Sequence, residues 1–265
     1  MATGGKQSIF NFAKDLFDNA QVLLNRIIEE DLFTCEAVVG IWPANSSIDD
    51  VVLYEDLEKQ NEVGRFHFVR RQQSLLDQPQ FCLSDFVAPI DSNRTDYLGA
   101  FAVCAGSGVD LLAQEFEDDN DDYNAIMTKA LGDRFAEAMA EYTHKKVREW
   151  WGFGKTENLS NSELIKEKYQ GIRPASGYPC QPDHTEKGTL FELLDAEKHA
   201  GISLTESYAM WPGAAVSGMY FAHPESQYFG VGKIDRDQVV DYAKRKGMDL
   251  ALCEKWLSPI LSYTP

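Results

Sequence analysis

The sequence predicts an α+β fold, and three observations support that class. Residues 9–28 and 123–150 both space their apolar side chains as amphipathic helices do. Runs of β-branched and aromatic residues occur between them without the regular strand–helix alternation of a parallel sheet. The 265 residues are 44% hydrophobic and 12% aromatic, which is enough to bury a sizeable core in one large domain or two small ones.

The first half of the chain predicts one helix followed by strands. In residues 9–28 the helical spacing brings together Phe12, Leu16, Leu23, Leu24 and Ile27. Strands are predicted after this helix at residues 37–42, 51–54, 65–70 and 97–105. Phe66 and Phe68 share one face of the third strand, and the fourth is apolar enough for the centre of a sheet.

A long helix is predicted at residues 123–150, after an acidic segment at 115–122. We interpret the acidic segment as a solvated helix N-terminus that the helix dipole favours. On a helical wheel, one apolar stripe is formed by Met127, Leu131, Phe135, Ala138, Met139 and Tyr142. Arg134 and Glu137 lie at its margin, where the spacing favours an ion pair on a solvated face over a charged pair that reaches a cleft.

The second half predicts an ordered loop, a hairpin and further helices. Residues 158–169 form a polar helix or loop, and two prolines and two glycines order the loop that follows at 171–179. Asp183 and Glu186 have the spacing of a capping box for a helix that ends at Gly201. The remaining segments predict a hairpin at 217–222 and 227–234, and helices at 235–247 and 249–257.

The charge of the chain argues against a nucleic-acid surface. It has 42 Asp and Glu against 25 Lys and Arg, a formal net charge of −17, whereas a phosphate backbone is bound by clustered cations. The five cysteines are widely separated, which favours free thiols in a reducing compartment. The longest uncharged stretch, residues 207–222, is too short and too broken to span a bilayer. We expect a cytoplasmic protein without a nucleic-acid or membrane partner.

The sequence contains no clear catalytic or metal-binding motif. Gly106-Ser107-Gly108 follows a strand but lacks the third glycine of a dinucleotide loop, so a plain turn explains it better. Neither a nucleophile elbow nor a phosphate loop is found. The histidines lack metal-ligand spacing, and the acidic segment lacks the glycine of a calcium loop. We expect no catalytic side chain and no metal site.

The residues that remain suit a small zwitterionic ligand. Arg173, which precedes a proline, can bind a carboxylate bidentately, and Glu137 can meet an ammonium group. Tyr178 and Tyr220 offer aromatic faces to a purine or an onium centre. Each of these residues alone is more often a surface or packing residue, so both interpretations stay open at this point.

Several longer motifs are more specific than these single residues. Residues 171–179 are G-I-R-P-A-S-G-Y-P, and residues 182–187 are P-D-H-T-E-K. Further motifs follow the same order along the chain at residues 39–44, 82–86, 96–99, 121–123, 129–138, 204–207, 216–221, 231–234 and 254–257. Together they resemble the reactivation (AdoMet-binding) domain of cobalamin-dependent methionine synthase. Because the resemblance spans nearly the whole chain, residues 1–265 are expected to form one such domain.

The resemblance implies a C-shaped single domain with a twisted antiparallel β-sheet flanked by helices. It also implies that S-adenosylmethionine (AdoMet) lies in a shallow groove, with Arg173 on its carboxylate and Glu137 at its polar end. The other AdoMet-binding residues that it implies are Ala175, Gly177, Tyr220 and Phe221. Asp133 and Tyr178 match positions that face the cobalamin of a partner domain.

The function that the resemblance implies is reductive reactivation of methionine synthase. The domain docks over inactive cob(II)alamin, an electron arrives from flavodoxin or a flavoprotein reductase, and the methyl group of AdoMet is transferred to cobalt. The domain places the ligand, which needs no side-chain nucleophile. The chain lacks a D-x-H-x-x-G cobalamin motif and a cysteine cluster for zinc, so we expect a module of a methyltransferase that is not a complete enzyme alone.

An alternative function follows from a segment that the family's domain carries before the matched region. That segment contains an Ile-Asp-Trp motif, and we expect it to be absent here. The alternative is a non-catalytic docking module for flavodoxin or a cobalamin domain that no longer binds AdoMet. Two basic clusters, Lys145-Lys146-Arg148 and Lys244-Arg245-Lys246, are candidates for attracting an acidic flavodoxin, although solvated helix faces explain them more simply.

Overall fold

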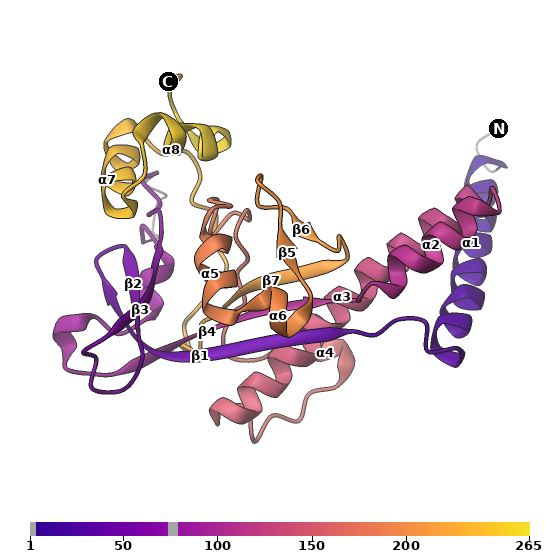
Figure 1. The fold of residues 1–265 in the computed structure, drawn as a ribbon, viewed down its shortest axis with the longest axis horizontal. Helices are drawn as coiled ribbons and strands as arrows, with labels where there is room; N and C mark the ends of the chain where they lie inside the picture. Colours follow the sequence, from indigo (N-terminus) through magenta and orange to yellow (C-terminus); the bar gives the residue numbers. More distant parts are fainter. Residues whose placement is uncertain (1–3, 74–78) are drawn as a thin grey trace.

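The computed structural model describes residues 4–73 and 79–265, and within these ranges a five-stranded antiparallel sheet forms the centre of the molecule. The strand order is β3-β2-β1-β4-β7. These strands are β1 (Glu36–Ser47), β2 (Asp50–Tyr54), β3 (Glu62–His67), β4 (Asp96–Cys104) and β7 (Ala215–Tyr220). The pairing of β1 with β4 runs along the long axis of the molecule (Figure 1). The predicted α+β class is confirmed.

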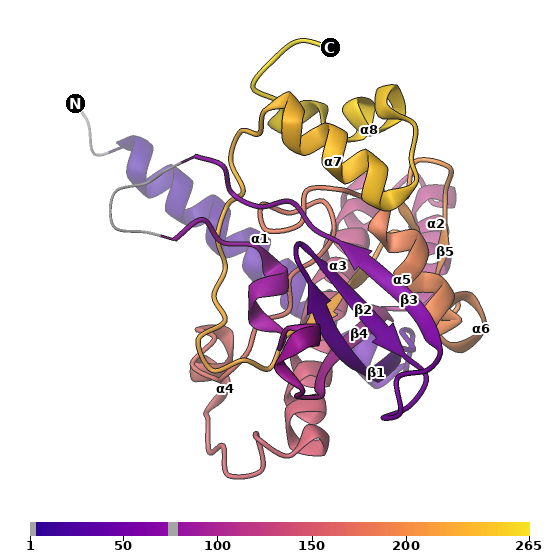
Figure 2. The same ribbon diagram turned by 90° about the vertical axis from the view of Figure 1, so that its left-hand side faces the viewer.

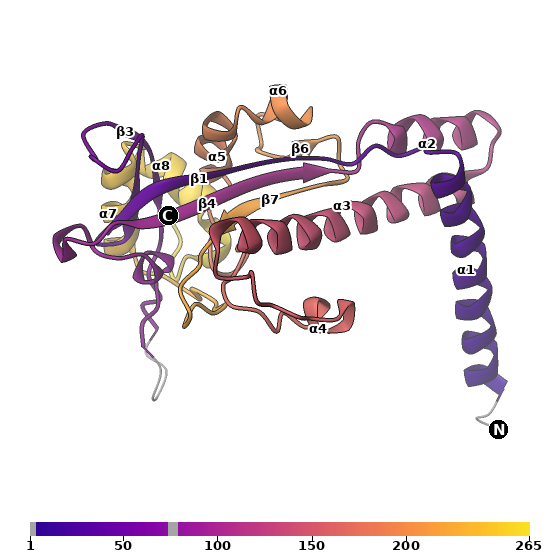
Figure 3. The ribbon, with the colours of Figure 1, turned by 90° about the horizontal axis from the view of Figure 1, so that it is seen from below.

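Helices lie on both faces of this sheet and at both of its ends. They are α1 (Gly4–Glu29), α2 (Gly108–Asp118), α3 (Asp122–Trp151), α4 (Asn161–Ile165), α5 (Glu186–Leu194), α6 (Ala196–Ala200), α7 (Arg236–Lys246) and α8 (Leu250–Trp256). Helix α3 packs on one face against β4 and β7, and α5 and α6 pack on the other (Figure 3). Helix α7 contacts β3 at one end of the sheet (Figure 2), whereas α1 lies at the opposite end.

In Figure 1, α1 and α2 at one end and α7 and α8 at the other rise on the same side of the long strands, which gives the outline that the expected C shape requires. A short hairpin of β5 (Ser203–Leu204) and β6 (Met210–Trp211) lies between them. Within the described residues, no helix is both long and apolar enough to cross a membrane.

Both long helices are confirmed, but the buried face of α3 agrees with the predicted stripe only in part, since Met127 is buried and Met139 is half-buried. Ala138 and Tyr142, which were expected to face inward, are exposed. Small residues take their place: Ala136 and Ala140 are fully buried, and Ala140 packs against Phe101 of the sheet. The predicted stripe consisted mostly of large apolar side chains. A helix that approaches a sheet closely needs small side chains at the surface that contacts the sheet.

The larger apolar residues of α3 pack against α1 instead. Leu131 and Phe135 are half-buried beside Leu23 and Ile27 of α1, which are buried as predicted. Leu16 is exposed, although the sequence placed it on the buried face. The side chain of Phe12 lies outside the described part of the structure. The apolar margin of α3 is therefore the surface on which α1 packs.

The acidic segment at 115–122 proves to be mainly a helix end. Residues 108–118 form α2, which the sequence analysis did not predict, so Glu115 and Asp118 belong to its last turn. Asp121 and Asp122 lie at a helix start, and the carboxylate of Asp121 accepts a hydrogen bond of 3.1 Å from Asn124 N of α3. Helix α2 begins at Gly108, where a Cβ atom would lie 1.9 Å from the carbonyl oxygen of Leu32.

Three predictions for the second half are wrong. The carboxylates of Asp183 and Glu186 form no capping box but are buried and face α7, where Lys246 binds both. The predicted hairpin is also absent within the described residues, because β7 pairs with β4 and residues 227–233 follow as irregular chain. In addition, the single helix expected up to Gly201 is interrupted at Asp195, which separates α5 from α6.

Candidate functional site

The loop at residues 171–179 lies along β7, the edge strand of the sheet. Ile172 and Phe221 exchange two backbone hydrogen bonds of 3.0 Å each. Next to them, Met219 N donates to the carbonyl oxygen of Pro174 at 3.0 Å. The prediction of an ordered loop is confirmed, and the loop holds Arg173 between two backbone-paired residues.

A tight turn at Gly177 brings the loop back on itself. Gly177 N donates to the carbonyl oxygen of Gln181 at 2.7 Å. Gly177 has a φ of +97°, and a Cβ atom there would lie 2.1 Å from Cε1 of His184. Both the backbone conformation and the adjacent ring therefore require glycine. The turn leaves Tyr178 63% exposed.

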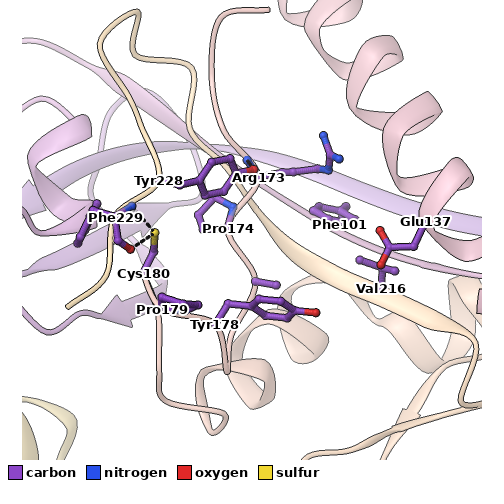
Figure 4. A pocket seen from close by; sticks show the side chains of 11 residues that line it. Phe101, Glu137, Arg173, Pro174, Tyr178, Pro179, Cys180, Val216, Tyr228 and Phe229 are labelled. Atoms are coloured by element: carbon purple, nitrogen blue, oxygen red, sulfur yellow. Dashed lines mark hydrogen bonds between the residues drawn. The ribbon is translucent and has the colours of Figure 1, made fainter. Parts of the chain in front are cut away.

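A pocket of about 470 Å³ opens beside this loop (Figure 4). It is lined by Phe101, Glu137, Arg173, Pro174, Ala175, Tyr178, Pro179, Cys180, Val216, Tyr228 and Phe229. A mostly apolar lining with a few charged groups is typical of a small-molecule site. The fold thus brings four predicted residues, Glu137, Arg173, Ala175 and Tyr178, to one pocket although they come from α3 and from the loop.

Tyr220 and Phe221 lie behind the wall of this pocket. Each is 1% exposed. The ring of Tyr220 stacks between Phe101, at a centroid distance of 4.6 Å, and His144, at 4.8 Å. Phe221 packs in the main hydrophobic core. Since Phe101 lines the pocket, Tyr220 supports the wall from behind.

Asp133 and Gly177 also lie outside the described lining of the pocket. Asp133 is exposed on α3, one turn before Glu137, and borders a separate hollow between α1 and α3. The exposed Glu137 forms no ion pair with Arg134 within the described ranges, so the ion pair favoured by the sequence is not seen. In Figure 4 the carboxylate of Glu137 lies near Phe101 and Val216.

Arg173 is the partly buried cation of the site. Its side chain is 16% exposed, and its Nη2 lies 2.8 Å from Oε2 of Glu141. Its Nη1 donates to the hydroxyl of Tyr169 and lies 3.4 Å from Nδ1 of His144. Burial by itself would lower the pKa of Arg173, but Tyr169 and Glu141 outweigh it and raise the pKa. The guanidinium therefore stays charged.

The residues that contact the Arg173 guanidinium were not predicted from the sequence; they are Glu141, Tyr169 and His144. Glu141 lies one helical turn after Glu137, and this spacing was the only available signal. Tyr169 follows α4, and no spacing rule connects it to α3. His144 is buried, and its pKa lies well below the ordinary value because of burial and of the nearby Arg148 and Arg173. The neutral imidazole can therefore accept a hydrogen bond from Arg173.

The basic clusters proposed for steering a partner are not exposed patches. Arg148 is 0% exposed and pairs with Glu157 at 3.0 Å. Arg245 pairs with Asp50, and Lys246 binds the buried Asp183 and Glu186. These three cations serve internal ion pairs, whereas Lys244 is exposed, so the clusters offer fewer free charges than the sequence suggests and the steering hypothesis stays a prediction. In the described ranges, no three His, Cys, Asp or Glu side chains are grouped as a metal site would require.

Comparison with known proteins agrees with this geometry. Residues 4–247 match the family model for the activation domain of vitamin B12 dependent methionine synthase. The crystal structure of the MetH reactivation domain bound to AdoHcy is 52% identical in sequence and superimposes with a TM-score of 0.92. The match covers 95% of this chain and 78% of that one. The chain belongs to the family of activation domains of vitamin B12-dependent methionine synthase.

Proposed function

We propose that this domain binds AdoMet in the pocket beside residues 171–179 and presents its methyl group to cob(II)alamin, for reductive reactivation of methionine synthase. The observation that carries the proposal is the 52% identity with a reactivation domain bound to AdoHcy, which is AdoMet without its methyl group. The domain is a module of an enzyme, and its part is to bind and orient the methyl donor.

The pocket offers separate charged groups for the carboxylate and for the ammonium group of AdoMet. Nε of Arg173 has no hydrogen-bond partner among the described residues and can donate to the ligand carboxylate. Glu137 offers a carboxylate for the ammonium group of the ligand. Ala175 and Gly177 are proposed as backbone contacts. Because Tyr220 and Phe221 are buried, we assign them backbone contacts or support of the wall.

We further propose that Tyr178 and Asp133 face the cobalamin-binding module of methionine synthase. Both are exposed, and Tyr178 stands beside the pocket. When bound, cobalamin supplies the cobalt that accepts the methyl group, and flavodoxin or a flavoprotein reductase supplies the electron. The residues described here hold the sulfonium methyl of AdoMet toward the opening of the pocket and need not donate a proton or act as nucleophiles.

Isothermal titration with AdoMet tests this proposal. We expect saturable binding by the wild-type domain and a loss of about 10- to 100-fold in affinity for Arg173→Ala, because a charge-assisted hydrogen-bond pair to the carboxylate is removed. Arg236→Ala removes an exposed arginine on α7 and should bind as the wild type does. A folded wild-type domain that does not bind AdoMet would overturn the proposal and favour the docking module.

A further inference from the structure

Behind the pocket, Glu141, His144 and Tyr169 surround the outer end of the Arg173 side chain, and Oε1 of the exposed Glu167 lies 3.8 Å from its Nη2. Glu141 and His144 come from the last turns of α3, and Tyr169 comes from the chain after α4. In Figure 4 the end of the Arg173 side chain points away from Tyr178 and Pro179. Glu141, His144 and Tyr169 line no part of the pocket, so their effect on a ligand would be exerted through Arg173.

A guanidinium offers two bidentate edges, one formed by its two terminal nitrogens and one by Nε and Nη2. The terminal edge is occupied, since Nη1 bonds Tyr169 and Nη2 lies 2.8 Å from Glu141. Tyr169 also donates to the same Glu141 carboxylate oxygen at 3.4 Å. On the side edge, Nε has no hydrogen-bond partner within the described part of the chain, and Arg173 lines the pocket. The terminal edge is thus fixed, while Nε stays available to a ligand.

The ring of Tyr169 is itself held by a buried cation, Arg148. The guanidinium carbon of Arg148 lies 3.8 Å from the centroid of the Tyr169 ring, a close cation–π contact. Arg148 is 0% exposed and pairs through Nε with both carboxylate oxygens of Glu157, at 3.0 and 3.1 Å. The ring of His144 meets Tyr169 edge to face at 5.0 Å. The phenol therefore has little freedom to rotate away from Arg173.

We infer that Glu141 and Tyr169 are positioning residues for ligand binding, which fix the terminal edge of Arg173 so that its Nε edge receives the ligand carboxylate. This inference rests on the proposed function. We call Glu141 and Tyr169 together the clamp. Without the clamp, the long arginine side chain would lose rotamer freedom each time a ligand binds, and this loss would weaken binding. The clamp selects for ligands with a carboxylate, because a ligand that lacks one gains nothing from an ordered guanidinium.

Two conservative variants, Glu141→Gln and Tyr169→Phe, test the inference by titration with AdoMet and with 5′-methylthioadenosine, which has no carboxylate. We expect each variant to bind AdoMet about tenfold more weakly and to bind methylthioadenosine as the wild type does. The matched controls are Glu149→Gln, in a half-buried pair with Lys146 on the same helix, and Tyr142→Phe at an exposed position. Both controls should leave both affinities unchanged.

A second readout needs no ligand. In the wild type the held guanidinium should give separate ¹⁵N NMR signals for Nη1 and Nη2 of Arg173, and these should merge in both variants because rotation becomes free. Unchanged AdoMet affinity with unmerged signals would overturn the inference, and so would an equal loss for both ligands, which would indicate a structural role. If Arg173→Ala loses binding but the clamp variants do not, only this inference fails. If the wild type does not bind AdoMet, the proposed function fails with it.

Discussion

At the scale of single residues, the site depends on a glycine as much as on charged side chains. Gly177 turns the loop between Arg173 and Tyr178 with a φ of +97°, a region that L-residues rarely adopt. The ring of His184 lies against it, and Lys187 Nζ holds that ring through Nδ1 at 3.0 Å. A new methyl group would therefore have to displace this exposed ring and disturb its hydrogen bond.

We expect Gly177→Ala to lower the free energy of unfolding by about 1–3 kcal/mol, because it combines an unfavourable backbone region with a clash. Urea unfolding measures this loss, and AdoMet titration should show weaker binding by the same variant. Gly213→Ala is the matched control, since a Cβ atom there meets nothing within 4 Å. Equal stability of the two variants would show that the turn tolerates a side chain.

Sequence reasoning found the residues that carry strong local signals and missed those that act through distant contacts. Arg173 and Tyr178 belong to a motif, and Glu137 lies on a periodic helix, so all three could be placed near a site. The packing of Tyr220 between two rings could not be foreseen, because it depends on β7 pairing with β4 rather than with the following residues. The contact of Tyr169 with Arg173 depends on how an irregular segment folds back on α3.

At the scale of elements, α3 shows why a helix can be predicted correctly and its buried face only in part. Its length and boundaries follow from periodicity, but its contact with the sheet includes small residues such as Ala140 beside Met139. Helix α2 was not predicted, because Gly106-Ser107-Gly108 resembles a plain turn in the sequence. In the structure α2 begins at Gly108, and Ser107 makes no capping hydrogen bond through its side chain.

The two faces of α3 can be compared directly with one substitution at two alanines. Ala140→Leu should lower the free energy of unfolding by about 1–3 kcal/mol, because extra methylene groups do not fit between a helix and the sheet that it touches. Ala138→Leu, at an exposed position, should change it by less than about 0.5 kcal/mol. Thermal or urea unfolding of both variants measures the two losses. A larger loss for Ala138→Leu than for Ala140→Leu would show that the face predicted from the sequence is the buried one.

At the scale of the whole molecule, buried charges attach α7 to the rest of the fold. Lys246 binds Asp183 at 2.8 Å and also Glu186, and Tyr242 donates to Asp183 at 2.7 Å. Burial would raise the pKa of Asp183, but Lys246 and Tyr242 outweigh it and lower the pKa below 3.8. The stability that Asp183 contributes is therefore present above its unfolded pKa and is lost as the pH falls through its lower folded pKa.

Lys246→Met should cost about 3–5 kcal/mol of stability near neutral pH, because it leaves two buried carboxylates without a cation. Without Lys246, burial raises the pKa of Asp183, so this carboxylate takes up a proton as the pH falls and the deficit shrinks. Urea unfolding at about pH 7 measures the stability deficit of the variant, and the same measurement at about pH 4.5 shows how far the deficit has shrunk. Lys244→Met, at an exposed position on the same helix, serves as control. A deficit that is independent of pH would argue against the network.

The pairing of the 171–179 loop with β7 has a consequence for how the protein behaves in solution. An edge strand with free backbone groups is a template for self-association. Here Ile172 and Pro174 occupy the donors of Phe221 and Met219, so the segment that carries Arg173 also covers that edge. The opposite edge strand, β3, is short and carries the charged pair Glu62 and Arg65. A chain that loosened this loop to gain adaptability at its pocket would also expose a surface on which it aggregates.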